Sequence, residues 1–196
     1  MANRNSAGFG LIAQGTVGST PATQGQGKYY IDAAYDTDMF QGTAVQSKVG
    51  YIKTAQAAIT DACIGILNGI FYNASSTQKP TWANWYNQPI TPANSEDLTA
   101  FVIDNPMQLF VGSLLTTAAQ SVYGYTVGLT VTAAGSEISG QSSSEIVGTV
   151  HATANQWRLL RSAEDPSNND ITANNCSFVV VQNLNQVNSG GLTSAS

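Results

Sequence analysis

Residues 98–112 read LTAFVIDNPMQLFVG, and this stretch sets the pattern for the whole chain. Two short apolar runs, residues 98–103 and 108–112, flank the triplet Asp104-Asn105-Pro106. Asn and Asp tolerate tight backbone conformations and proline has no backbone N–H to donate, so the triplet predicts a turn. Val, Ile, Phe and Thr on either side fit the half-buried surface of a pleated strand. The stretch therefore predicts two strands with a turn between them.

Runs of the same kind recur along the chain, at residues 8–13, 28–32, 41–53, 62–72, 122–132, 146–150, 157–160 and 178–181. In the run 122–132, strict alternation places Val127, Leu129 and Val131 on one face of a strand. Glycines inside or beside such runs are typical of bulges and of the sharp bends of a closing barrel. Residues 114–121 leave room for one or two turns of helix. The predicted fold class is all-β, a compact β-barrel or sandwich.

The two ends differ from the middle in composition. Residues 14–27 read QGTVGSTPATQGQG and residues 186–196 read QVNSGGLTSAS, both small, polar and rich in glycine. Such segments have too little apolar surface to offset the entropy lost on ordering. We therefore expect an extended N-terminal arm over residues 1–27, a single β domain over 28–185 and a flexible tail over 186–196.

Charge is scarce in this chain. Of 196 residues, 42% are hydrophobic and only 10% are charged, with 7 Lys and Arg, 12 Asp and Glu and a net charge of −5. Affinity for nucleic acid comes from clustered Lys and Arg, so no nucleic-acid partner is expected. Weak self-repulsion also protects the surface poorly against association. The composition suits a protein that ends up in an assembly.

No membrane partner and no export are expected. No segment approaches the roughly 18 to 20 consecutive apolar residues of a membrane span. The start, MANRNSAGFGLIAQG, lacks the apolar stretch of a secretory signal. Cys63 and Cys176 are far apart and each lies in an apolar context, which favours buried free thiols over a disulfide or a metal pair.

The sequence offers little chemistry, and we expect no catalytic residues, no cofactor and no metal. His151 is the only histidine, and no Gly-x-Ser-x-Gly turn accompanies it. The stretch 25–28, GQGK, lacks the first glycine and the final hydroxyl of a phosphate loop. The carboxylates of residues 163–170 lack the calcium-loop spacing, which favours a solvated turn. Paired acids for glycoside cleavage, Glu96 with Asp97 or Glu137 with Glu145, stay open without positive support.

An aromatic segment is the most unusual feature. Residues 71–89 read FYNASSTQKPTWANWYNQP, with Trp82, Trp85 and Tyr86 in a stretch whose prolines and asparagines oppose a regular strand or helix. Three interpretations compete: a lid on the protein's own barrel, an anchor inserted into a partner protein, or a stacking platform for a sugar.

Five blocks of the sequence, in this order and spacing, resemble a family of small structural proteins of tailed bacteriophages, the capsid cement or decoration proteins. The blocks are Gly8-Phe9-Gly10-Leu11; Tyr30-Ile31 with residues 37–42 and Val45; residues 65–72 leading into Trp82; residues 100–106 with Phe110 and Val111; and residues 157–160 leading into Asp165-Pro166. The chain departs from the family at its end, where Asn183-Leu184-Asn185-Gln186 contains no histidine.

The resemblance implies a virion structural protein that is assembled in the host bacterial cytoplasm and placed on the outside of the capsid. Its expected partners are the major capsid protein and other copies of itself, as a dimer or trimer. We expect the partner contacts at Phe9, Leu11, Trp82, Trp85 and Tyr86. The alternative is a tail or fibre module that binds a host-surface receptor or glycan through the same aromatic residues.

Overall fold

The protein is built from antiparallel strands. A computed structural model describes residues 3–18, 25–55, 61–130, 134–148 and 155–188. Its strands are β1 (Ile12–Thr16), β2 (Gly27–Ile31), β3 (Ala44–Lys48), β4 (Tyr51–Thr54), β5 (Gly65–Asn73), β6 (Pro80–Ala83), β7 (Leu98–Ile103), β8 (Gln108–Ser113), β9 (Thr126–Val127), β10 (Trp157–Ser162) and β11 (Ser177–Gln182). Two short 3-10 helices, Ala93–Ser95 and Gln120–Val122, complete the described elements. None of the helices in these residues is long and apolar enough to cross a membrane.

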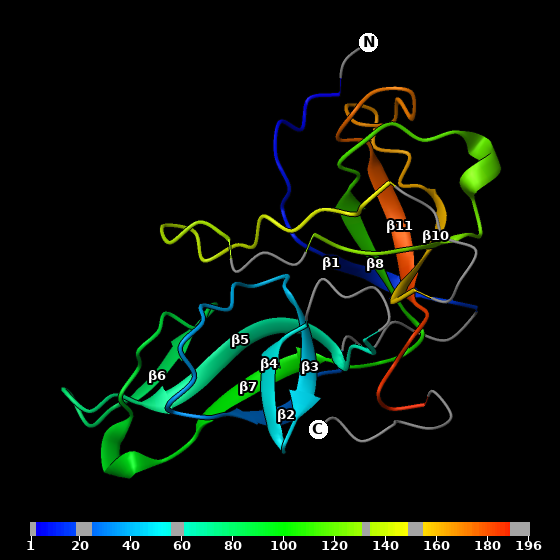
Figure 1. Ribbon diagram of the computed structural model, residues 1–196. Helices are drawn as coiled ribbons and strands as arrows, with labels where there is room; N and C mark the ends of the chain where they lie inside the picture. Colours follow the sequence, from blue (N-terminus) through cyan, green and yellow to red (C-terminus); the bar gives the residue numbers. More distant parts are fainter. Residues whose placement is uncertain (1–2, 19–24, 56–60, 131–133, 149–154, 189–196) are drawn as a thin grey trace.

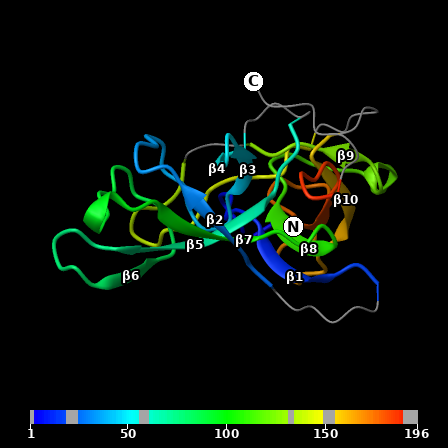
Figure 2. The ribbon, with the colours of Figure 1, turned by 90° about the horizontal axis from the view of Figure 1, so that it is seen from below.

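The strands form two sheets. Sheet A has five strands in the order β1-β8-β11-β10-β9, and sheet B has six, in the order β2-β7-β5-β3-β4 with β6 paired to β5. Sheet A and β6 lie at opposite ends of an elongated molecule (Figures 1 and 2). The all-β prediction is confirmed, although neither sheet formed by the described strands closes into a barrel.

The stretch 98–112 connects the two sheets. Strand β7 lies inside sheet B and pairs with β2 and β5, whereas β8 lies inside sheet A and pairs with β1 and β11. The predicted turn is confirmed between them, because the N–H of Gln108 donates to the carbonyl of Asn105 at 3.0 Å. The Asn105 side chain also accepts from the N–H of Met107 at 3.0 Å. The two strands are therefore neighbours in sequence but not partners in a sheet.

Two hydrophobic cores stabilise this arrangement. The inter-sheet core combines Phe110, Trp157 and Phe178 of sheet A with Ile66 and Ile103 of sheet B. The sheet B core lies against the other face of sheet B, and its members include Ile31, Leu67, Ile70, Tyr86 and Leu98. Strands β2 and β4, at the two ends of sheet B, also contact each other, so this sheet curls around its core.

Several strand predictions differ from the structure. The run 41–53 is a hairpin, because Val49 and Gly50 both have positive φ and turn β3 into β4. In the run 122–132 the described strand is only Thr126–Val127, and Ile146 forms isolated bridges to Leu114 and Leu129 instead of a strand. Residues 114–121 hold only the start of a 3-10 turn.

Strand β6 was not expected from the sequence. Pro80 begins it and Trp82 lies within it, although proline is unfavourable in strands. Because β6 pairs only with β5 among the described strands, no ladder hydrogen bond is lost on its other side. An edge position explains why the proline is tolerated.

Part of the segment expected as an N-terminal arm belongs to sheet A. Residues 12–16 are β1, which pairs with β8 inside sheet A. Before it, the Asn3 side chain donates to the carbonyls of Asp170 at 2.9 Å and Asn174 at 2.8 Å. At the other end, the Gln186 side chain accepts from the N–H of Ser47 at 2.7 Å. Residues on both sides of the expected domain limits at 27 and 185 are thus hydrogen-bonded to the β domain.

Candidate binding surface

An aromatic face lies on the uncovered part of sheet B. Tyr30 pairs with Thr99, Thr99 with Phe71 and Phe71 with Trp82, which makes one row across four strands. Residues directly opposite in antiparallel strands share a face. Tyr30 is 47% exposed, Phe71 39% and Trp82 51%. We call Tyr30, Phe71, Trp82 and the half-buried Phe101 the aromatic face.

The Trp82 side chain lies flat along the sheet because of a glycine. Its ring centroid is 5.2 Å from that of Phe101, at an interplanar angle of 46°. A Cβ added to Gly69 would lie 2.4 Å from Trp82 Cζ2. The absence of a side chain at Gly69 therefore makes the space in which the indole rests.

The aromatic face carries little charge. The Lys28 ammonium lies 5.7 Å from the centre of the Tyr30 ring, a cation–π distance. Tyr29, the next residue along β2, points to the opposite face and donates to the Asp104 carboxylate at 2.7 Å. Burial and this carboxylate hold the pKa of Tyr29 well above its usual range. The exposed face of sheet B is thus aromatic, and the Lys28 ammonium lies at its rim.

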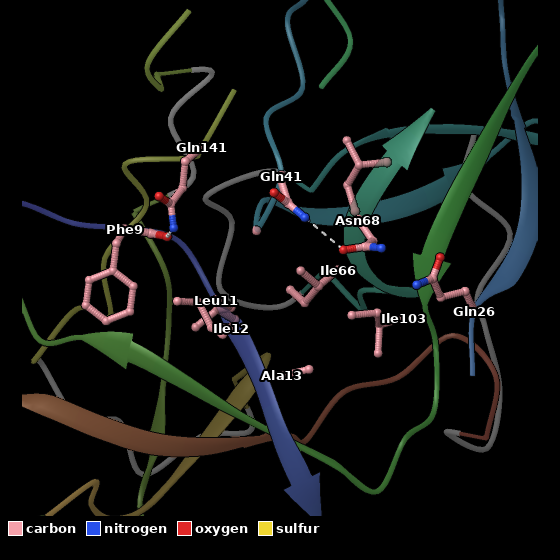
Figure 3. Close-up of a pocket in the computed structure, with 12 residues that line it drawn as sticks. Phe9, Leu11, Ile12, Ala13, Gln26, Gln41, Ile66, Asn68, Ile103 and Gln141 are labelled. Atoms are coloured by element: carbon pink, nitrogen blue, oxygen red, sulfur yellow. Dashed lines mark hydrogen bonds between the residues drawn. The ribbon is translucent and has the colours of Figure 1, made fainter. Parts of the chain in front are cut away.

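A pocket of about 330 Å³ lies where sheet B passes beneath β1 (Figure 3). Its apolar side is formed by residues such as Phe9, Ile12 and Ile103, and its polar side by side-chain amides. Gln41 Nε2 donates to Asn68 Oδ1 at 2.9 Å. None of the described residues that line it is charged. The volume is at the lower end of the range of about 300–1,000 Å³ for small-molecule sites.

The pocket and the aromatic face are continuous. Along β7, Ile103 lies in the pocket and Phe101 belongs to the aromatic face, two residues apart on the same side of the strand. Gln26, which lines the pocket, lies two residues before Lys28 at the rim of the aromatic face. A molecule that covers the aromatic face can therefore also reach the pocket.

Phe9 and Leu11 are held at this junction by the backbone. The N–H of Leu11 donates to the carbonyl of Gly42 at 2.9 Å, and Gln141 Nε2 donates to the carbonyl of Phe9 at 3.2 Å. Phe9 is half-buried on the wall of the pocket, whereas Leu11 is 4% exposed and packs in the inter-sheet core. In this conformation Phe9 offers some surface to a partner and Leu11 almost none.

Trp85 and Tyr86 differ from Trp82. Trp85 stacks on Phe40 with ring centroids 4.7 Å apart and planes within 8°. Tyr86 is fully buried in the sheet B core and its hydroxyl donates to the carbonyl of Tyr35 at 2.6 Å. Of the three aromatic residues expected to contact a partner, Trp82 is open, Trp85 is half-buried and Tyr86 is part of the protein's own core.

The structure also shows the surroundings of the groups considered from the sequence as catalytic or metal-binding candidates. Asp165 accepts from the side chain of Asn168 at 2.7 Å, and this bond lowers the pKa of its carboxyl. Among the residues that the structure describes, no three His, Cys, Asp or Glu side chains gather as a metal site would require. Cys63 and Cys176 are buried and free, which confirms the prediction for the thiols. His151 lies outside the described residues.

The structure shows the surroundings of the two pairs of acids named from the sequence. Glu96 accepts from the Asn73 side chain at 3.4 Å, while Asp97 accepts from the Tyr51 hydroxyl at 3.2 Å. Glu137 is exposed, and burial raises the pKa of Glu145. Glu96 and Asp97, although adjacent in sequence, thus have separate hydrogen-bond partners.

Tyr30, Phe71 and Phe101 were not expected from the sequence to belong to one surface. Each is a normal strand residue when read alone, and only the pairing of β2, β7 and β5 brings them together. Comparison of the chain with models of protein families, with curated proteins and with solved structures found no match. The aromatic face therefore has to be interpreted from its own chemistry.

Proposed function

We propose that this protein is a virion structural protein of a tailed bacteriophage, a capsid cement or decoration protein. It binds the outside of the shell formed by the major capsid protein and stabilises the head. The proposal assigns it no reaction. The observation that carries it is the aromatic face of Tyr30, Phe71, Trp82 and Phe101, exposed on a chain that is only 10% charged.

Such a face has the chemistry of a protein interface. The centres of interfaces are enriched in aromatic residues and depleted in charge, and a few aromatic anchors supply most of the binding energy. Trp82 is held in place by Phe101 and Gly69, so it loses little side-chain entropy on docking. Many modest contacts to a lattice add up when oligomers bind several sites at once.

The capsid contact is tested with heads that lack this protein. Purified protein is mixed with such heads, the heads are pelleted and the bound protein is quantified. Replacement of Trp82 by Ala removes the largest exposed side chain of the aromatic face, and we expect at least a ~10-fold loss of affinity. Stability of the free protein should fall by only about 1 kcal/mol, because the indole is half exposed.

The matched control is Tyr125→Ala, which removes a 49% exposed aromatic residue next to sheet A. This variant should bind heads like the unchanged protein. Equal binding by the two variants would rule out the aromatic face as the contact surface. Failure of the unchanged protein to bind any head preparation would reject the cement function itself.

A tail or fibre module is the second candidate. The uncharged pocket beside the aromatic face, with the amides of Gln41, Asn68 and Gln141, favours it because amides and aromatic rings also recognise sugars. The number of copies per virion separates the two functions. A shell protein should be present in roughly hundreds of copies per virion, a number set by capsid symmetry. A tail protein should be present in at most about a few dozen copies.

Self-association is part of the proposal, with a dimer or trimer as the expected state. Closed symmetric oligomers are the commonest assemblies of identical chains. Strands β1 and β6 lie at sheet edges among the described strands, and edge strands pair readily with further chains. Sedimentation of the purified protein measures this state directly.

A further inference from the structure

A second pocket lies at the end of sheet B that is remote from sheet A. It has a volume of about 360 Å³, and its polar and aromatic lining consists of Tyr72, Ser75, Ser76, Trp85, Asn87 and Thr91. We call it the Trp85 pocket. Its wall includes Ala83, whose side chain points to the opposite face of β6 from Trp82. A protein docked through the aromatic face would therefore leave the Trp85 pocket uncovered.

The chemistry of the pocket is polar but neutral. None of the described residues that line it is charged, so it holds no fixed partner for an ionic ligand. The side chains of Tyr72, Ser75, Ser76, Asn87 and Thr91 make no hydrogen bond within the described part of the chain. Four hydroxyl groups and one amide, all able both to donate and to accept, thus surround one cavity.

The aromatic wall is rigid. One face of the Trp85 indole stacks on Phe40, at 4.7 Å and 8°. A Cβ added to Gly140 would lie 2.5 Å from Trp85 Cδ1, so the backbone of that loop packs closely against the indole. Asn84, the residue after β6, donates from Nδ2 to the carbonyl of Ser139 at 2.6 Å and so holds the same loop close to the end of β6. Trp85 is therefore positioned before any ligand arrives.

We propose that the Trp85 pocket binds a neutral saccharide unit. A pyranose ring has an apolar C–H face that packs on an aromatic side chain, and hydroxyl groups that exchange hydrogen bonds with Ser, Thr and Asn. An apolar ligand would displace water from these polar groups without replacing its hydrogen bonds, and an ion would find no opposite charge among the described lining residues. This site extends the proposed function, because it gives a protein docked through its other face a means to bind glycans.

The test uses saturation-transfer difference NMR on the full chain. The probes are the methyl glycosides of glucose, galactose, mannose and N-acetylglucosamine. At least one should receive saturation, with a dissociation constant on the order of 1 mM, as is usual for a single small polar ligand in an open site. The double variant Ser76→Ala with Asn87→Ala should lose at least a ~10-fold factor in affinity, because both groups would serve as direct partners.

Two controls make the result decisive. Ser76 and Asn87 are exposed, so the double variant should keep the melting temperature of the unchanged protein. Trp82→Ala, on the opposite face, should keep the saccharide affinity. The proposal is overturned if no glycoside receives saturation at tens of millimolar, or if the double variant binds as well as the unchanged chain. Neither result bears on capsid binding, which depends on the aromatic face.

Discussion

Trp82, Trp85 and Tyr86 lie close together in the sequence and meet three different environments. Trp82 rests on Gly69 in the open, Trp85 stacks on Phe40, and Tyr86 is buried with its hydroxyl bonded to the Tyr35 carbonyl. The alternatives of lid, anchor and platform therefore do not apply to the segment as a unit. Each side chain has its own surroundings, according to the face on which it lies.

The buried thiol of Cys63 predicts a loss of stability at alkaline pH. Burial and, less strongly, Asp61 raise its pKa from 9.0 to about 12. Between these values the unfolded chain loses the proton that the folded protein keeps, so rising pH favours unfolding. The protonated Cys63 thiol makes its full contribution to the free energy of unfolding below pH 9. This contribution is lost toward pH 12, with a slope of up to about 1.4 kcal/mol per pH unit.

Denaturant unfolding at a series of pH values from 8 to 10 measures this slope below most tyrosine ionisation. Cys63→Ala should be less stable throughout, because it leaves a small cavity, but its stability should depend less on pH. An equal slope in both proteins would show that other groups cause the alkaline loss. Slopes are compared because the cavity shifts only the absolute values.

At the scale of the element, β5 and β6 create the aromatic face together. Pairing of Phe71 with Trp82 sets which side chains share the outer side, and the register shift between Leu67 and Gly69 places the glycine beneath the indole. A bulge changes the face on which later residues of a strand lie. The surface thus depends on the local geometry of β5 as much as on Trp82 itself.

Gly69→Ala should displace the Trp82 ring. The new Cβ would lie 2.4 Å from Trp82 Cζ2 and 2.9 Å from the carbonyl oxygen of Ala83, so the indole and β6 must move. We expect a loss of about 1–3 kcal/mol of stability, as for other overpacked sites, and head binding as weak as in Trp82→Ala. Thermal unfolding and the pelleting assay measure the two effects.

Gly15→Ala in β1 is the control, because nothing lies within 4 Å of the added Cβ. It should change stability by less than about 0.5 kcal/mol. If Gly69→Ala is tolerated equally well, the indole does not rest where the structure places it.

The N-terminal segment cannot be deleted without loss of a strand of sheet A. Removal of residues 1–27 would delete β1 and the buried Leu11 as well as the polar residues that follow. Loss of one buried leucine costs about 2–5 kcal/mol, so the truncated protein would lose much of its stability. Loss of head binding after such a deletion would not identify a docking arm.

At the scale of the whole molecule, the low charge predicts how docking responds to salt. If desolvation of the aromatic face drives head binding, affinity should change by less than about threefold between ~50 mM and ~1 M sodium chloride. Lys28→Glu, which reverses the charge beside Tyr30, should also change the affinity by less than about threefold. Sedimentation binding at several salt concentrations measures this, and release of the protein by molar salt from intact heads would contradict the mechanism.

The sequence by itself determined the fold class, the Asp104-Asn105-Pro106 turn and the burial of the cysteines. These features follow from local chemistry: side-chain alternation, the backbone freedom of turn residues and the apolar context of each thiol. The strand β6 was not predicted because it begins with Pro80. Proline is tolerated there only at an edge of the sheet, and that position depends on the other strands.

Only the tertiary structure decided which strands share a sheet and which aromatic residues share a face. Strands β7 and β8 are separated by one turn yet belong to different sheets. Tyr30, Phe71 and Trp82 meet because β2, β7, β5 and β6 pair in one register. Register depends on contacts between distant segments, and a shift of one residue moves every side chain of a strand to the other face.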